Sequence, residues 1–171
     1  MKRQLSLNEY RNIDLALFAV MLAIFEFIIV FASTRLFPGQ AFTVSLAAAI
    51  VSIVYMRWGF WGAIHAAMAG VLFSLYNGAD TKRIIIYTVG NLLSLAAVPM
   101  VAKSPNYEKV RTGKYLSLAF PVLVLLLMQL GRAIVALILG ASPSSVLDFF
   151  TTDALSYVFT IVIIWIARRL D

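Results

Sequence analysis

A small set of polar and charged residues interrupts the long apolar segments of this chain, and these residues are its candidates for chemistry. Glu26 lies inside the apolar run Leu15–Phe31, and Arg132 lies inside another such run. An ionisable side chain within a membrane-spanning segment is costly, so it usually marks a functional site. Seven residues are the predicted contacts for a polar ligand: Asn77, Tyr87, Asn91, Gln129, Arg132, Asp153 and Tyr157.

Most of these candidates occur as pairs at helical spacing. Residues three or four apart project from the same side of a helix, and this spacing holds for Tyr87–Asn91, Gln129–Arg132 and Asp153–Tyr157. Tyrosine rings supply stacking area, while amides and a guanidinium supply directional hydrogen bonds. These residue types and spacings predict the lining of a polar binding pocket.

The composition indicates an integral membrane protein. Of the 171 residues, 62% are hydrophobic and only 13% are charged, whereas a soluble domain is nearer half apolar and a quarter charged. The net charge of +6 is explained by basic residues on cytoplasmic loops, so no nucleic-acid partner is expected. The chain has no cysteine and a single histidine, which argues against thiol catalysis and multi-histidine metal centres.

Motifs for catalysis or nucleotide binding are absent from the sequence. It contains no phosphate-binding loop with its lysine, no HExxH and no GxSxG. We therefore expect a protein that is not an enzyme, carries no cofactor and has no ATP site of its own.

Periodic apolar segments predict one all-α membrane domain over residues 1–171, with six transmembrane helices. The short polar leader Met1–Asp14 is expected to form an interfacial helix that ends at Asp14, and no cleavable signal peptide is evident. The expected spans cover residues 15–33, 41–56, 58–76, 84–102, 115–139 and 152–168, with a cytoplasmic loop at 103–114 and a further loop at 140–150.

The distribution of basic residues predicts that both termini are cytoplasmic. With that orientation, a rise of about 1.5 Å per residue puts Glu26 about 16 Å from the cytoplasmic end of its helix. Gln129 and Arg132 then lie about 21 and 25 Å along the fifth helix, in the outer half of the membrane. The polar residues of the last three helices thus predict a pocket near the outer face.

Simpler interpretations of the same residues remain open. Glu26 and Arg132 could form a buried ion pair that determines helix packing. Asp153 could be a helix N-cap. His65 is expected to be a hydrogen-bonded packing residue, and the chain's three tryptophans suit the membrane interface.

Small residues line the first three predicted helices. Ala19 and Ala23 form an AxxxA pair, and similar faces occur at 47–49 and 63–70. Such a face lets another helix approach closely. It serves either internal packing or docking of another membrane protein.

Taken together, the chain resembles the substrate-binding S components of energy-coupling factor (ECF) transporters. The resemblance rests on six predicted helices with both termini inside, on Ala19-Val20-Met21-Leu22-Ala23, on a basic fourth-to-fifth loop and on the last helix DALSYVFTIVIIWIARRLD. The stretches Tyr76-Asn77-Gly78 and Ile85–Asn91 are most similar to the hydroxymethylpyrimidine or pyridoxine type.

This resemblance implies a multi-pass protein of a bacterial plasma membrane that binds a small water-soluble vitamin or precursor. The implied partners are a transmembrane T subunit and two cytoplasmic ATPases, with Ala19 and Ala23 as the docking pair. The seven candidate residues become ligand contacts, and the loop Arg35–Gln40 becomes a lid.

Other functions remain possible on the same sequence. The vitamin could instead be riboflavin, thiamine or pantothenate. The chain could be a non-transport scaffold of the cell-shape type, or a small intramembrane enzyme or carrier that uses Glu26 as a proton acceptor.

Overall fold

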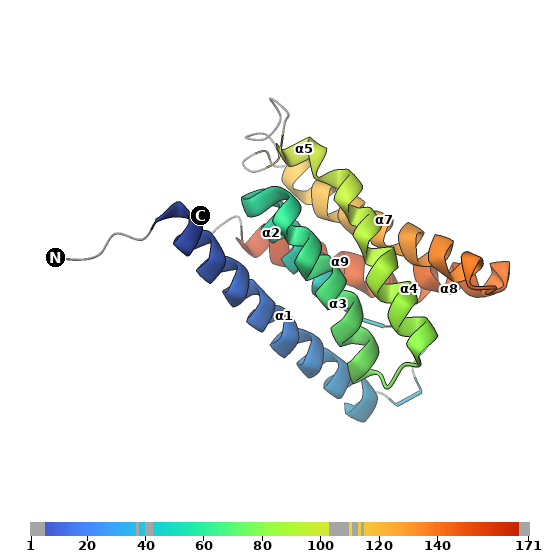
Figure 1. Cartoon of the computed structure of the whole chain (residues 1–171). Helices are drawn as coiled ribbons and strands as arrows, with labels where there is room; N and C mark the ends of the chain where they lie inside the picture. Colours follow the sequence, from blue (N-terminus) through green and yellow to red (C-terminus); the bar gives the residue numbers. More distant parts are fainter. Residues whose placement is uncertain are drawn as a thin grey trace.

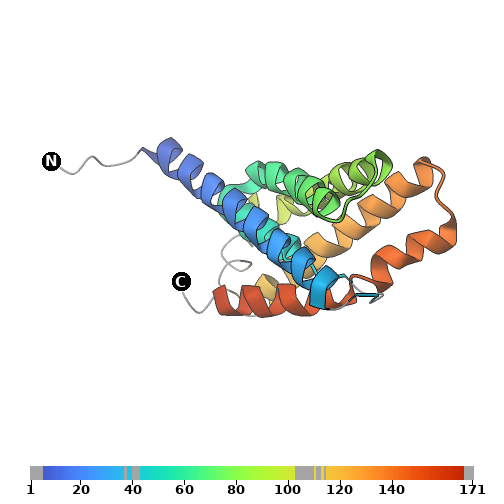
Figure 2. The same ribbon diagram turned by 90° about the horizontal axis from the view of Figure 1, so that it is seen from below.

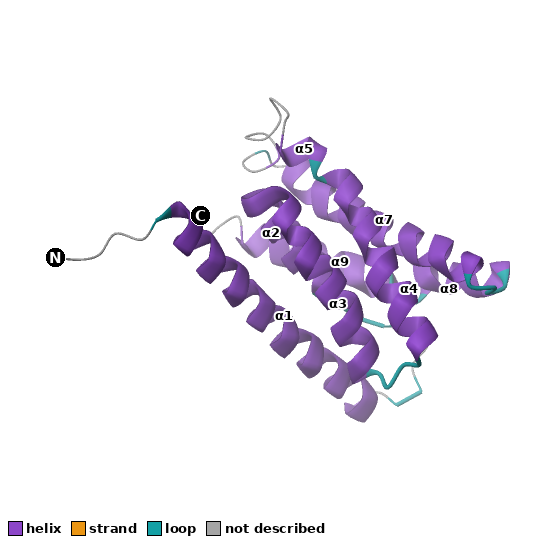
Figure 3. Cartoon of the chain, viewed as in Figure 1, coloured by secondary structure: helices purple, strands orange, loops and turns teal. Residues whose placement is uncertain are grey.

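The described part of the chain is built from helices. A computed structural model describes residues 6–36, 38–39, 43–102, 110, 113 and 115–167. Within these residues there is no strand (Figure 3), so the predicted all-α class is confirmed for them. The predicted loop at 103–114 and the end of the last predicted span, at residue 168, lie outside the described residues, apart from Val110 and Gly113.

The described chain is a succession of helices (Figure 1). In chain order they are α1 (Leu7–Leu36), α2 (Ala47–Trp58), the 3₁₀ turn η1 (Gly59–Trp61), α3 (Gly62–Tyr76), α4 (Thr81–Asn91), the 3₁₀ helix η2 (Leu92–Ala97), α5 (Pro99–Ala102), α7 (Leu116–Ile138), α8 (Pro143–Thr151) and α9 (Ala154–Ala167).

Five helical stretches of the described chain are long and apolar enough to cross a membrane. They are Leu7–Leu36, Ala47–Tyr76, Thr81–Val101, Leu116–Ile138 and Pro143–Ala167. The sequence predicts six spans. The difference arises because α2, η1 and α3 form one uninterrupted run of helical residues, although the chain reverses direction within it.

The reversal between α2 and α3 follows from their contacts with α1. Trp58 Nε1, at the end of α2, donates to Asp14 Oδ2 at 2.6 Å, whereas Glu26 accepts from the amide of Ala47 at the start of α2. α2 is therefore antiparallel to α1. His65 near the start of α3 bonds Leu15 O, so α3 runs parallel to α1. Gly59, with φ of +56°, makes the tight turn that side chains disfavour.

The first helix begins earlier than the sequence analysis predicts. Ser6 and Glu9 form a reciprocal capping box: Ser6 N donates to Glu9 Oε2 at 2.9 Å, and Glu9 N donates to Ser6 Oγ at 3.3 Å. Because this box starts a helix that continues without a break to Leu36, the leader from Leu7 to Asp14 belongs to α1.

The loop predicted for residues 140–150 is wrong over most of its length, because α8 occupies residues 143–151. Ser142 Oγ accepts from Ser145 N at 3.3 Å, and Pro143 occupies the first helical position, where its missing N–H costs nothing. Proline and serine, read as loop residues, are here helix-start signals.

The bundle has two distinct ends. One contains the start of α1, the turn between α2 and α3 and the end of α9, and we call it the closed end. The other contains the end of α1, the turn between α3 and α4, and α8, and we call it the open end. Figures 1 and 2 show that the start of α1 and the end of α9 lie at the same end, with α8 at the other. The apolar core between them includes Tyr55, Val124 and Met128 in one cluster and Phe18 and Leu22 in a second.

Candidate binding site

Two glycines bring α4 and α7 into backbone contact near the middle of the bundle. A Cβ placed on Gly90 would lie 2.5 Å from the backbone nitrogen of Arg132, and one on Gly131 would overlap the carbonyl oxygen of Gly90. Any side chain at either position would push the two helices apart. The close approach puts the next residues, Asn91 on α4 and Arg132 on α7, within hydrogen-bonding reach of each other.

Arg132 is the centre of a buried polar network. Its Nε donates to Asn91 Oδ1 at 2.8 Å, and its terminal nitrogen pairs with Asp153 Oδ2 at 2.8 Å. Asn91 in turn donates to Ala66 O on α3 at 3.0 Å, and the hydroxyl of Thr43 donates to Asp153. Because both charges are paired and hydrogen-bonded, the network meets the condition under which a buried ion pair is tolerated.

Aromatic rings cover this network on the side of the open end. The Arg132 guanidinium lies 4.7 Å from the ring centroid of Tyr87, a cation–π distance. The Tyr87 ring contacts Phe73 of α3, with centroids 4.9 Å apart, and Phe149 of α8 at 5.9 Å in an edge-to-face arrangement. We call Phe73, Tyr87 and Phe149 the aromatic cluster. It joins three helices, and its central ring is held by the guanidinium below.

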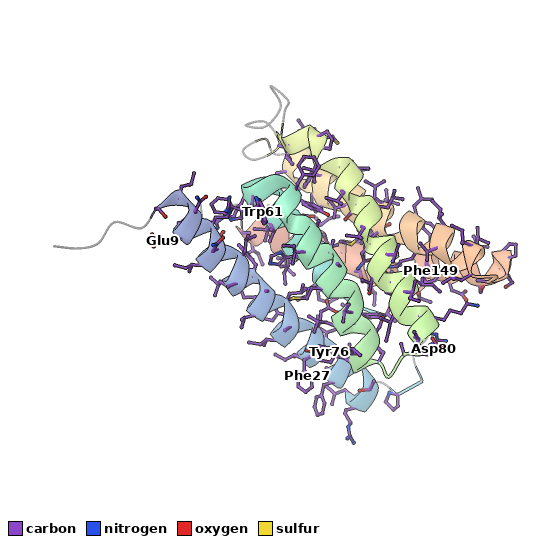
Figure 4. All side chains as sticks on the ribbon, in the orientation of Figure 1. Glu9, Phe27, Trp61, Tyr76, Asp80 and Phe149 are labelled. Atoms are coloured by element: carbon purple, nitrogen blue, oxygen red, sulfur yellow. The ribbon has the colours of Figure 1, made fainter. Side chains whose placement is uncertain are left out.

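A cavity of about 470 Å³ adjoins the aromatic cluster at the open end. This volume falls in the range of small-molecule sites. Polar and charged side chains contribute much of its lining. In addition to the aromatic cluster, the residues that line it include Thr43, Ser74, Asn77, Asp80, Lys82, Arg83, Ser145 and Asp148. Figure 4 shows Asp80 at the start of α4 and Phe149 on α8 at this end of the bundle.

A second cavity, of about 620 Å³, lies beside the first. Thr43 and Asn77 border both cavities. Its other walls are mostly apolar and come from the end of α1 and the start of α9, including Ile29 and Phe159. Pro38 and Gly39 also line it, so the described part of the predicted lid borders this cavity; Phe37 and Gln40 lie outside the described residues.

The predicted site residues separate into three groups. Asn77 and Tyr87 line the first cavity. Asn91, Arg132 and Asp153 are at most 5% exposed and lie in the network beneath it, bonded to one another. Gln129 and Tyr157 bond each other between α7 and α9 and line neither cavity.

Several cavity residues escaped the sequence analysis. Phe149, Asp148 and Ser145 lie on α8, whose segment is predicted as a loop. Lys82 and Arg83 also line the cavity, beside the turn between α3 and α4. Two adjacent basic residues next to a turn are a sequence signal from which these two cavity residues could have been predicted.

The suggested ion pair between Glu26 and Arg132 is wrong: the ion pair of Arg132 is with Asp153. Glu26 Oε1 instead accepts from Ser45 Oγ at 2.7 Å and from the amides of Leu46 and Ala47, each at 3.0 Å. A carboxylate from α1 therefore caps the N-terminus of α2, where backbone N–H groups lack partners and the helix dipole is positive.

The Asp153 side chain bonds residues of distant segments instead of the amides of its own helix. It precedes α9, yet its two carboxylate oxygens are taken by Arg132 and Thr43. His65 is 2% exposed and bonds a backbone carbonyl, which confirms its predicted packing role.

Ala19 and Ala23 are partly buried beside the packed stripe of α1, which is formed by Phe18, Leu22 and other residues. The most exposed face of the helix carries larger side chains, such as Ile24. The alanine pair therefore lies at the edge of the contact between α1 and the bundle.

No protein-family model, curated protein or solved structure matches this chain. The site must therefore be interpreted from its own geometry. Among the described residues, no group of three or more His, Asp or Glu side chains is arranged to hold a metal ion. The arrangement provides a polar cavity on a rigid base, which is suited to binding.

Proposed function

We propose that this chain is a membrane-embedded binding protein that captures a small polar molecule in the first cavity. The observation that carries the proposal is the position of this cavity over the aromatic cluster and the Arg132 network. The polar groups of the Arg132 network beneath the cavity are already paired with one another, and they hold the cavity walls in place. Preorganisation of this kind reduces the entropy lost on binding.

The membrane orientation that we propose puts the open end outside. α2 and α3 then cross the membrane as two separate short helices, so the chain has six transmembrane helices. The segments that adjoin the closed end in sequence, 1–5, 103–114 and 168–171, contain most of the lysines and arginines of the chain. Basic residues favour the cytoplasmic side, so the cavity would open outward.

The larger role that we propose is that of an S component of an ECF-type importer for a water-soluble vitamin or precursor, in a bacterial plasma membrane. The resemblance noted from the sequence supports this role. An outward-facing cavity without an energy source suits a subunit that hands its ligand to a T subunit and two ATPases. In this scheme the edge of α1 at Ala19 and Ala23 contacts the T subunit.

Binding can be tested on the full chain purified in detergent. Native mass spectrometry should detect a bound small molecule, and isothermal titration with pyridoxine, hydroxymethylpyrimidine, riboflavin, thiamine and pantothenate should identify a vitamin ligand. Tyr87→Ala should weaken that binding. Tyr115→Ala is the control and should not weaken it, because Tyr115 is 80% exposed and lines neither cavity. A chain that retains no small molecule and binds none of these compounds would contradict the proposal and favour a scaffold.

The docking surface can be tested separately by uptake. Ala19→Trp and Ala23→Trp should abolish vitamin uptake in cells while leaving binding by the purified protein unchanged, because the added ring blocks helix approach. Leu17→Trp, at a position 55% exposed on another face of α1, is the matched control and should transport normally. Uptake that persists in both alanine variants would remove this surface from the proposal.

A further inference from the structure

Charges of both signs line the first cavity without meeting each other. Lys82 and Arg83 come from the first turn of α4, and Asp148 comes from the last turn of α8. Within the described chain, none of these three side chains forms an ion pair. The other acid at the cavity, Asp80, caps α4 by accepting from the Arg83 amide at 2.8 Å.

Each of these charges is opposed by the helix that carries it. The N-terminus of a helix is the positive end of its dipole, and the C-terminus is the negative end. Lys82 and Arg83 lie near the positive end of α4, and Asp148 lies near the negative end of α8. Helix stability therefore favours the opposite charge at all three positions, so their placement calls for an explanation outside the helices.

A buried hydroxyl gives a second, independent indication of a ligand. Ser74 of α3 lines the same cavity and is 1% exposed, yet its Oγ has no hydrogen-bond partner among the described residues. Buried polar atoms are nearly always paired, and leaving one unpaired is costly. A polar group of a bound molecule would satisfy it.

The remaining wall of the cavity is apolar. Phe73 and Phe149 from the aromatic cluster line it, together with Ile86 and Ala136. These surfaces suit the hydrophobic or aromatic body of a ligand. The cavity thus offers separate environments for an anion, a cation and an apolar body.

We propose that the first cavity binds a zwitterion, with its anionic group toward Lys82 and Arg83 and its cationic group toward Asp148. Its body lies against Phe73 and Phe149. This inference rests on the proposed binding function and narrows the class of ligand. It explains why opposite charges face one cavity unpaired: the ligand supplies a partner to each.

Three probes with one shared ring separate the two charge requirements. Phenylalanine carries both charges, phenethylamine only the positive one and 3-phenylpropionate only the negative one. We expect phenylalanine to bind the detergent-purified full chain at least about fivefold more tightly than either of the others, since each exposed ion pair adds modestly to affinity. The measurement is isothermal titration, repeated at high salt, where the preference should shrink.

Charge-removing variants assign each group of the ligand to its side chain. Asp148→Asn should lower phenylalanine affinity to that of 3-phenylpropionate, and the double variant Lys82→Gln, Arg83→Gln should lower it to that of phenethylamine. Ser144→Asn, on an exposed residue of α8 that does not line the cavity, should change nothing. All of these side chains are exposed, so the variants should fold.

The outcomes distinguish this inference from the proposed function. If the three probes bind equally, or none binds, the zwitterion assignment is overturned, and so it is if Asp148→Asn has no effect on the preference. Retention of an uncharged small molecule by the purified chain would then still support a binding protein. Absence of any bound or titratable small molecule would overturn both.

Discussion

The two ends of the bundle use the same types of side chain for different purposes. At the closed end, Asp14 accepts from Trp58 at 2.6 Å and pairs with Arg57 at 3.1 Å, and Arg57 also donates to the hydroxyl of Tyr10. Arg11 lies over the ring of Trp61 at 4.5 Å. At this end the charges and rings contact one another, and the turn between α2 and α3 is held against α1.

At the open end, acidic, basic and aromatic residues line the first cavity, whereas the second cavity has mostly apolar walls. Among the described residues, Lys82, Arg83 and Asp148 at the first cavity form no ion pair, while the pair beneath them, Arg132 and Asp153, is almost fully buried. The comparison teaches that residue type alone does not distinguish a structural cluster from the binding site that we propose. What distinguishes them is whether each charged side chain already has a partner of opposite charge, or a hydrogen-bond partner, within the protein.

The largest predicted effect lies under the open end. Arg132→Met removes the partner of Asp153 and leaves a buried carboxylate unpaired, so we expect a loss of about 3–5 kcal/mol in the free energy of unfolding. The measurement is titration with sodium dodecyl sulfate in mixed micelles, followed by circular dichroism.

Replacing both partners provides the control for this prediction. The double variant Arg132→Met, Asp153→Leu leaves no unpaired buried charge and should recover most of the lost stability. A double variant as unstable as Arg132→Met alone would mean that packing, not pairing, is what Arg132 provides.

The next effect concerns the carboxylate that caps α2. Glu26→Ala removes the acceptor of Ser45 Oγ and of the Leu46 amide, whereas the Ala47 amide keeps Ser45 Oγ at 3.1 Å as an acceptor. At about 1 kcal/mol for each donor left without an acceptor, a loss of about 2 kcal/mol in unfolding free energy is expected. Glu26→Gln keeps a carbonyl oxygen in place and should cost less than half as much. Equal losses in the two variants would show that the negative charge, rather than the acceptor, stabilises α2.

The smallest effect is expected at the closed end. The side chain of Arg57 is 36% exposed, and the buried Asp14 keeps its hydrogen bond from Trp58 when Arg57 is removed, so we expect this pair to contribute about 1 kcal/mol. Arg57→Met should therefore lower the free energy of unfolding by no more than that, in the same titration. A loss equal to that of Arg132→Met would erase the distinction between the two ends.

Much of the fold could be predicted because its signals are local. The apolar lengths of α1 and α7 exceed what a membrane crossing needs, so their existence followed from the sequence. The first residues of the helices were harder to predict, because the Ser6–Glu9 box and the Ser142–Pro143 start are short polar patterns that also occur in loops. For that reason α8 and its cavity residues were missed.

The site was predicted only in part, since side-chain partners depend on helix rotation and on contacts between distant segments. The spacing and depth of Asn91 and Arg132 along their helices predicted a shared polar region, and the two side chains do bond each other. It could not show that Arg132 would choose Asp153 over Glu26, because both acids were available in the sequence.

The sequence by itself determined that this is a helical protein with segments long and apolar enough to span a membrane, because hydrophobic length is a property of the chain itself. It also indicated Asn91, Arg132 and Asp153, which form one buried polar network, but not the charged residues of the first cavity. Only the tertiary structure decided their partners, because the close approach of Gly90 and Gly131 and the reversal at Gly59 set which side chains meet. That geometry made Glu26 a cap and Arg132 the base of the cavity.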